Sequence, residues 1–257
     1  MLRPRIIPCL LVKDGGLVKT VGFDDPKYVG DPINAVRIFN EKEVDEIIVL
    51  DIDATADSRE PDYAMIENLA AECRMPLCYG GGVKSVDQAK KIISMGVEKV
   101  ALSAAAVEDP QIVTRLAEVI GRQSVVVVLD VRKAGLMRKH EICTRNGTRR
   151  SGRSPAEFAR EMEDLGAGEI VVNSIDQDGA MTGYDHRLIA EVRDAVSLPM
   201  TALGGAGSLD DLRELIARHG VIGAAAGSLF VFKGKYRAVL INYPDRDEKD
   251  AIATATG

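Results

Sequence analysis

The chain has 257 residues, of which 46% are hydrophobic, and its net charge at neutral pH is −6. This length suits one large α/β domain or two small ones, and the acidic balance argues against a nucleic-acid-binding protein. Four cysteines without CxxC or metal-ligand spacing predict free thiols, and we expect neither a metal nor a cofactor. The sequence shows no signal peptide and no 18-residue apolar span, so we expect a cytoplasmic protein that is not in a membrane.

Short apolar runs alternate with helix-length amphipathic segments, which is typical of βα units in a parallel sheet. The predicted strands are 5–12, 46–52, 77–80, 98–103, 124–131, 169–175, 199–203 and 222–228. The predicted helices are 31–42, 62–73, 85–95, 109–120, 154–165, 185–196, 208–218 and 235–242. This order predicts a single (β/α)8 TIM barrel over residues 1–243, followed by a polar tail, 244–257, that frays.

An internal repeat supports the barrel. Residues 46–53 (EIIVLDID) match 169–176 (EIVVNSID), and residues 81–93 match 204–216 at the same offset. Two similar half-barrels of four βα units each explain this duplication. A doubly wound sheet is the alternative fold, but it predicts no duplicated half.

Small residues follow four of the predicted strands in matching places of the two halves. Glycine lets backbone N–H groups approach an anion, and the start of the next helix adds a favourable dipole. One such turn is more often a tight βα connection, but two symmetric copies predict a ligand with a phosphate at each end. The candidate phosphate-binding residues are Gly81, Gly82, Ser103 and Ala104 in the first half and Gly204, Gly205, Gly227 and Ser228 in the second.

Aspartates at the C-terminal ends of predicted strands are candidate acid–base groups, because barrel active sites lie on that face. A carboxylate in a cleft of low dielectric can have a raised pKa and exchange protons with a substrate. Asp130 is the strongest candidate, because it ends the otherwise apolar run 124–131. Asp51 and Asp176, with Asp178 beside them, are further candidates. The alternative for Asp51 and Asp176 is that they cap helices or hold loops.

Two groups of charges remain. Arg5, Glu46, Lys99 and Glu169 stand at or beside the first residue of four strands, where they either form a salt-bridged ring across the bottom of the barrel or remain solvated. The basic segment 132–153 contains Asn146-Gly147, a candidate hairpin turn. This segment favours an anionic substrate, as does Lys19 after the first strand. A solvated charged hairpin is the alternative for the basic segment.

The stretches RIIPCLLVKDG, FDDPKYVGDP, YGGGVKS, AAAVEDP, GAGEIVVNSIDQDG and LGGAGS resemble the cyclase subunit (HisF) family of imidazole glycerol phosphate synthase over nearly the whole chain. The resemblance implies a barrel that docks a glutaminase (HisH-like) subunit on its N-terminal face and receives ammonia through its core. On the opposite face, a substrate with two phosphates becomes imidazole glycerol phosphate and an aminoimidazole ribotide. Arg5, Glu46, Lys99 and Glu169 match the family's ammonia gate, and Asp130 matches one of its two catalytic aspartates.

The chain departs from the family pattern at three places. Leu11 stands where the other catalytic aspartate is expected, Ser103-Ala104 replaces Asn-Thr, and Asn173-Ser174 replaces Thr-Ser. The stretches LLVKDGGLVKT and DPKYVGDPINAVRIFNEKEVDE resemble a paralogous branch that is linked to amidation of surface-polysaccharide sugars, together with a separate sugar amidotransferase. A non-catalytic ammonia conduit and a related phosphosugar isomerase are the alternatives. Leu11 and the gate charges argue against the isomerase.

Overall fold

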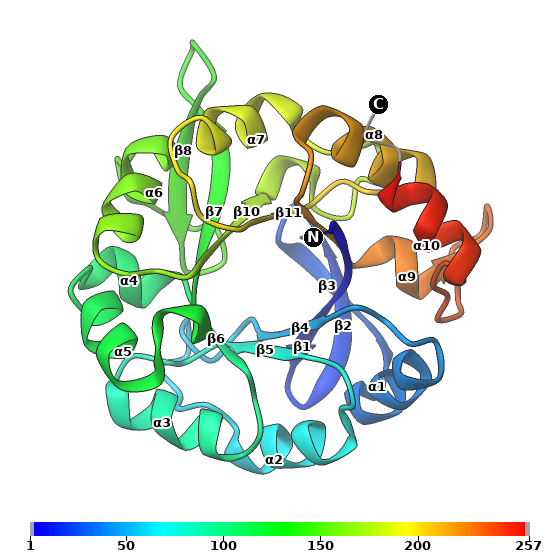
Figure 1. The fold of residues 1–257 in the computed structure, drawn as a ribbon, viewed down its shortest axis with the longest axis horizontal. Coiled ribbons are helices and arrows are strands. Elements are labelled where there is room, and N and C mark those ends of the chain that lie inside the picture. Colours follow the sequence, from blue (N-terminus) through cyan, green and yellow to red (C-terminus); the bar gives the residue numbers. More distant parts are fainter. Residues whose placement is uncertain (1–2, 255–257) are drawn as a thin grey trace.

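The structure is a computed structural model that describes residues 3–254. Figure 1 looks down a barrel whose central strands are surrounded by a ring of helices. The strands of the barrel are β1 (Arg5–Lys13), β4 (Ile47–Asp51), β5 (Leu77–Gly80), β6 (Lys99–Leu102), β7 (Val125–Ala134), β10 (Glu169–Ser174), β11 (Met200–Leu203) and β12 (Gly223–Ala226). Neighbouring strands are parallel, β1 pairs with β12, and β7 pairs with β10, so the sheet closes on itself. The predicted barrel is confirmed, and a doubly wound sheet is excluded because such a sheet has open edges.

The outer ring covers the strands with amphipathic helices. Its members are α1 (Pro32–Glu41), α2 (Tyr63–Glu72), α3 (Val86–Ser94), α5 (Ile112–Ile120), α6 (Pro155–Asp164), α7 (His186–Arg193), α8 (Leu209–His219) and α10 (Arg246–Ala253). At the start of α1, the Asp31 carboxylate accepts from the backbone N–H of Asn34 at 2.8 Å, and Pro32 occupies the first turn. This pairing of a capping oxygen with a proline begins the helix where the sequence predicts it.

Shorter elements extend the strand ends. They are β2 (Gly16–Val21), β3 (Asp24–Gly30), α4 (Ala104–Glu108), η1 (Arg122–Ser124), β8 (Lys139–Thr144), β9 (Arg149–Arg150), η2 (Ile175–Gln177), α9 (Ser228–Val231), β13 (Phe232–Lys233) and β14 (Ala238–Val239). The hairpin of β7 and β8 projects beyond the ring of helices (Figure 1). Asn146 and Gly147 have φ angles of 55° and 74° in the turn between β8 and β9, as a type I′ turn requires. That predicted turn is confirmed.

The C-terminal region differs from the prediction in two respects. The helix expected at 235–242 is wrong: β13 and β14 form a two-stranded hairpin there, with Gly234 at φ 72° in its turn. The expected fraying is also wrong for 246–253, because Asp245 begins α10 with a capping box and Ile252 is fully buried. The tail is polar on average, but its one large apolar residue, Ile252, packs the helix against the barrel. Residues 255–257 lie outside the described part of the chain.

The core has two layers. The larger layer lies between the strands and the helices, and the smaller one fills the inside of the barrel. Strand residues face one layer or the other, which explains why β7 has an unbroken apolar run. Cys9, Cys73, Cys78 and Cys143 are all free thiols, as the sequence predicts. Across residues 3–254, no helix is both long and apolar enough to cross a membrane.

Candidate functional site

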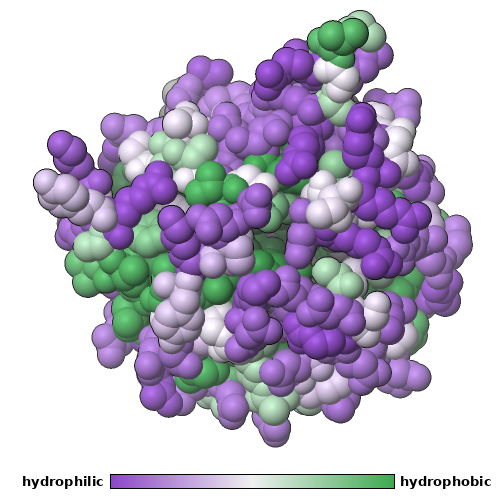
Figure 2. All heavy atoms as spheres, turned by 180° about the vertical axis from the view of Figure 1, so that it is seen from behind, coloured by the Kyte–Doolittle hydropathy of each residue, from purple (hydrophilic) through white to green (hydrophobic). Residues whose placement is uncertain are grey.

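A pocket opens at the C-terminal ends of the barrel strands. Figure 2 shows the molecule from the side opposite to Figure 1, with a hollow near the middle of that face. Most of the predicted site residues line this pocket, which brings together segments from both half-barrels. They are Lys19, Asp51, Gly81, Gly82, Ser103, Ala104, Asp130, Gly204, Gly205, Gly227 and Ser228.

Asp130 lies in the middle of β7, one residue before the pairing of β7 with β10 ends, and its carboxylate is in the pocket wall. The Ser103 hydroxyl donates to its Oδ2 at 2.9 Å, and the Asn173 side-chain amide donates to its Oδ1 at 2.9 Å. Burial raises the pKa of Asp130 to about 6, although these two hydrogen bonds act in the opposite direction. A carboxyl group with this pKa can take up and release protons near neutral pH.

Leu11 lines the same pocket but supplies no acid or base. Its backbone pairs with Leu50 in β4 and with Val18 in β2, so the side chain belongs to a regular part of β1. Leu11 and Leu50 pack against the layer inside the barrel. The pocket therefore has an apolar floor at the position where the resemblance implies a second catalytic carboxylate.

Asp51 and Asp176, the other predicted catalytic aspartates, mainly hold local structure. Asp51 Oδ1 accepts from the backbone N–H groups of Asp53 (3.2 Å) and Ala54 (3.1 Å), and Arg59 lies 3.4 Å from its Oδ2. Asp51 still lines the pocket. Asp176 is exposed, is not among the pocket-lining residues, and accepts from the backbone N–H of Lys133 at 2.9 Å. The loop-holding alternative thus describes Asp176, because the short helix η2 turns its side chain away from the pocket.

Asp178, which the sequence also offers as a candidate acid–base group, lines the pocket. Its Oδ2 accepts from the Thr20 hydroxyl at 2.6 Å and from the backbone N–H of Phe23 at 3.1 Å. Burial raises its pKa. The sequence feature that indicates this role is the position of Asp178 two residues after Asp176, directly after η2, where its side chain lies in the pocket.

Lys19 belongs to β2 instead of a free loop. The β2–β3 hairpin folds over the barrel, and Lys19 is buried with its Nζ donating to the Cys9 carbonyl at 2.8 Å. Burial lowers the pKa of Lys19. The Lys19 Nζ lies in the pocket wall beside Gly227, where an added Cβ would be 2.7 Å from it.

The two glycine turns have matching geometry. Gly81 and Gly204 have φ angles of +119° and +94°, and an added Cβ would lie 2.4 Å from the Asp51 carbonyl oxygen or 2.7 Å from that of Ser174. Asp51 and Ser174 are themselves equivalent in the internal repeat. Both turns thus require glycine for the same two reasons, backbone conformation and space.

The helix starts nearest the pocket are those of α4 and α9. Their N-cap residues are Ser103, whose side chain makes no cap hydrogen bond, and Gly227, which has no side chain to make one. By contrast, α3 and α8 are capped by Ser85 and Ser208, which accept from their own helices. The starts of α4 and α9 are therefore the better donors for an anion in the pocket.

The basic segment 132–153 contributes less positive charge than its sequence suggests. Arg145 and Asn146 reach the pocket. Lys133 pairs with Asp185 at 2.5 Å, and Arg150 pairs with Glu141. Arg153 also pairs with Glu161, and Arg145 and Arg149 share Glu108, so five of the eight Lys and Arg side chains of the segment form ion pairs.

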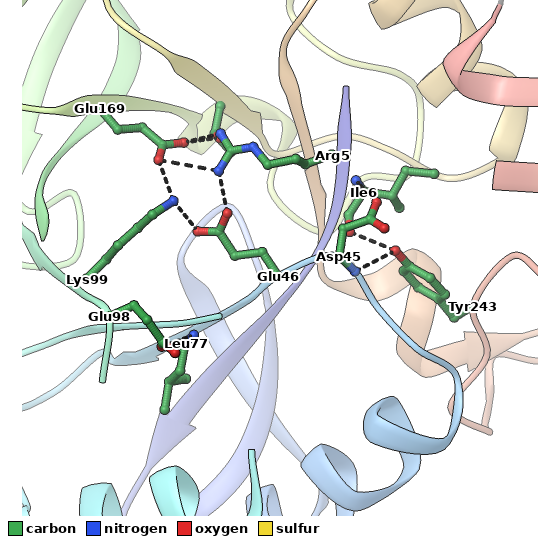
Figure 3. Close-up of polar contacts among 10 residues, drawn as sticks. Arg5, Ile6, Asp45, Glu46, Leu77, Glu98, Lys99, Glu169 and Tyr243 are labelled. Atoms are coloured by element: carbon green, nitrogen blue, oxygen red, sulfur yellow. Dashed lines mark hydrogen bonds and ion pairs between the residues drawn. The ribbon is translucent and has the colours of Figure 1, made fainter. Parts of the chain in front are cut away.

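Four charged side chains form a closed ring at the other end of the barrel (Figure 3). Arg5 contacts Glu46 and lies 2.7 Å from Glu169 Oε1. Lys99 Nζ lies 2.7 Å from Glu46 and 2.8 Å from Glu169 Oε2. The four side chains point toward one another, so the solvated alternative is wrong.

Thr201 is a fifth member of this ring that sequence reasoning missed. Its hydroxyl donates to Glu169 Oε1 at 2.6 Å and accepts from Arg5 at 3.4 Å. Burial alone would raise the pKa of Glu169, but Arg5 and Lys99 hold it at about 2. The second residue of a buried strand gave no signal of this contact.

Among residues 3–254, no group of three or more His, Cys, Asp or Glu side chains is arranged to hold a metal ion.

Comparison with known proteins agrees with this geometry. The family described as "Histidine biosynthesis protein" matches residues 5–237. A protein from Leptospira borgpetersenii, provisionally named imidazole glycerol phosphate synthase subunit HisF, is 54% identical over 98% of this chain and 99% of its own length. A Vibrio vulnificus protein, provisionally named subunit hisF3 of the same synthase, is 56% identical over 97% of this chain and 96% of its own. The subunit HisF from Hyphomonas neptunium is 43% identical over 90% and 91%. The chain therefore belongs to the histidine biosynthesis protein family as a HisF-like member.

Proposed function

We propose that this protein is the HisF-like synthase subunit of a glutamine amidotransferase complex, which uses ammonia on a substrate with two phosphates. The reaction of the named relatives is that of imidazole glycerol phosphate synthase, a cyclase step in histidine biosynthesis. Asp130 is the proton-transfer group, and the glycine turns with the starts of α4 and α9 hold the phosphates.

The single observation that carries this proposal is the pairing of a closed charge ring at one mouth of the barrel with a pocket at the other. Between them lies the inner layer, which includes Ile7, Cys9, Ile48 and Ala225. A neutral ammonia molecule can pass an apolar interior more easily than an ammonium ion, because burial penalises the charge. The ring of Arg5, Glu46, Lys99 and Glu169 is the gate at the entrance.

The proposed partner is a HisH-like glutaminase that docks on the N-terminal face of the barrel. The ring lies at that face and is fully paired within the free subunit, so docking does not have to neutralise isolated buried charges. Docking there would place the source of ammonia directly over the gate.

The test is product formation from the two-phosphate substrate of the histidine pathway with ammonium salt as the nitrogen source. The purified chain should form imidazole glycerol phosphate, and Asp130→Asn should lower the rate by about 10²-fold or more, because it removes the acid–base group. Equal rates for the two proteins would contradict the proposal.

A second candidate function is favoured by Leu11. A pocket with an apolar floor in place of one catalytic carboxylate suits a paralogue that serves amidation of a surface-polysaccharide sugar, with a separate sugar amidotransferase as a further partner. In its extreme form, the subunit conducts ammonia and performs no chemistry. The paralogue and the non-catalytic conduit both predict that Asp130→Asn still delivers glutamine-derived ammonia to the sugar amidotransferase. An assay of the amidated sugar would measure this delivery.

A further inference from the structure

The two side chains that hold Asp130 lie on either side of it, Ser103 just after β6 and Asn173 in β10, and both are unusual for their positions. Asn173 is the fifth of the six buried residues of β10, directly across from Asp130 in the β7–β10 pairing. A buried amide needs hydrogen-bond partners, and its Nδ2 donates to Asp130 Oδ1 at 2.9 Å.

Ser103 is the N-cap residue of α4, where a serine hydroxyl normally accepts a hydrogen bond from a backbone N–H of the helix. Here it makes no cap hydrogen bond and donates to Asp130 Oδ2 at 2.9 Å instead. The hydroxyl is thus directed to the carboxylate at the expense of its own helix. The two donors together engage both oxygens of Asp130 from opposite neighbouring strands.

We propose that Ser103 and Asn173 are positioning residues that fix the orientation of Asp130 and control where its proton resides. This inference rests on the proposed function, in which Asp130 transfers protons. An amide N–H only donates, so Asn173 opposes protonation at Oδ1. A hydroxyl both donates and accepts, so Ser103 can stay bonded when Oδ2 carries a proton. The proton therefore resides on Oδ2, beside Ser103.

This arrangement gives one carboxyl group of the pocket, Asp130, a defined geometry. Leu11 cannot exchange a proton, and Asp51 is engaged by its own loop. Because the two donors favour the charged form while burial opposes it, they hold the pKa of Asp130 below the value that burial alone would produce.

The test is a carbon-13 NMR titration of the Asp130 carboxyl group, assigned by comparison with Asp130→Asn. Asn173→Leu keeps the volume but removes the donor, and it should raise the pKa of Asp130 by about one unit or more. Ser103→Ala should raise it by less, because the lost hydroxyl served both protonation states. Ser103→Thr, which keeps the hydroxyl, should restore the wild-type value.

Ser174→Ala is the matched control, since Ser174 is an equally buried neighbour whose side chain points to the other face of β10. It should leave the Asp130 pKa unchanged. If Asn173→Leu does not fold, Ser103→Ala and Ser103→Thr carry the test alone. Unchanged pKa values in the Ser103 and Asn173 variants would overturn the proposal, and a larger shift from Ser103→Ala than from Asn173→Leu would overturn the placement of the proton.

The titration needs no turnover, so it separates this inference from the proposed function. An inactive protein with the expected pKa shifts would reject the proposed function and retain the positioning roles. An active protein should also show the acidic limb of its kcat profile move upward with the Asp130 pKa in Asn173→Leu.

Discussion

Under the proposed function, Leu11 and Asp130 determine how much of the family's chemistry this pocket can perform. Both residues line the pocket at strand ends, but only Asp130 carries a group that exchanges protons. The apolar side chain of Leu11 also removes a negative charge that would raise the pKa of Asp130 further.

Leu11→Asp should raise the ammonium-dependent rate, because it supplies a second carboxylate at the pocket wall. The expected gain is about 10²-fold, the lower end of what one acid–base group contributes. The measurement is imidazole glycerol phosphate formation at saturating ammonium. Leu11→Asn is the matched control, with the same shape and no acid–base capacity. A wild-type rate that Leu11→Asp does not change would show that the missing carboxylate is not what limits this chain.

Asp130 should reduce stability at the pH where it is useful. Its folded-state pKa of about 6 lies above the ordinary value of 3.8, so the folded protein binds more protons than the unfolded chain between these values. Its contribution to stability therefore falls as pH rises from about 4 to 6, and the deficit is complete above 6. Asp130→Asn has no charge to bury, so it should be more stable than wild type by about 1–2 kcal/mol at pH 8. This is less than the full shift in the pKa would give, because the pocket only partly shields the site from water.

Urea denaturation of both proteins at pH 8 and pH 4 checks this expectation. The stability difference should shrink toward zero at pH 4. A difference that is the same at both pH values would mean that the proton affinity of Asp130 does not change on folding.

At the scale of single elements, the sequence predicted the eight barrel strands well because each is a short apolar run bounded by turn residues. It failed where an element depends on a tertiary contact. The sequence predicts no strand over residues 16–30, where the β2–β3 hairpin pairs with β1 and buries Lys19. The sequence marks Asn173 only as a departure from the family pattern, because its contact with Asp130 is made between neighbouring strands.

Helix α10 is the clearest case of an element that depends on one buried side chain. Ile252→Ala should lower the free energy of unfolding by about 2–5 kcal/mol, because the side chain is fully buried in the outer core. Chemical denaturation measures this change. Ala251→Ser on the exposed face of the same helix is the control and should change stability by about 0.5 kcal/mol or less. Equal effects of the two substitutions would mean that α10 contributes no packing.

The charge ring joins four strands and should stabilise the N-terminal mouth of the barrel. Glu169→Gln leaves Arg5 and Lys99 with one carboxylate between them and weakens the contact with Thr201. We expect a loss of about 3 kcal/mol at pH 7, measured by denaturation. Glu118→Gln, on the exposed side of α5, is the control. Because the pKa of Glu169 is lowered to about 2 from 4.5, the contribution of this ring should be lost as pH falls from about 4.5 to 2.

At the scale of the whole molecule, the internal repeat predicted more than periodicity did. It placed glycine turns at equivalent positions in both halves, and the structure gives Gly81 and Gly204 the same backbone constraint. The repeat could not predict which half supplies the chemistry. Asp130 and Asn173 come from the adjacent strands β7 and β10, which belong to the second half. In the function proposed above, the two ends of the barrel have separate tasks, ammonia entry at the ring and chemistry at the pocket.

The most direct measurement of this division follows the origin of the nitrogen in the product. The complex with the proposed glutaminase is supplied with the two-phosphate substrate and with glutamine labelled with nitrogen-15 in its amide. Unlabelled ammonium is added in excess over the glutamine, but below the concentration at which ammonium alone drives the reaction. Ammonia that passes the ring and the barrel interior does not mix with the solution, so the product should carry the label undiluted. A product whose label is diluted to the ratio in solution, or no product at all, would contradict the account.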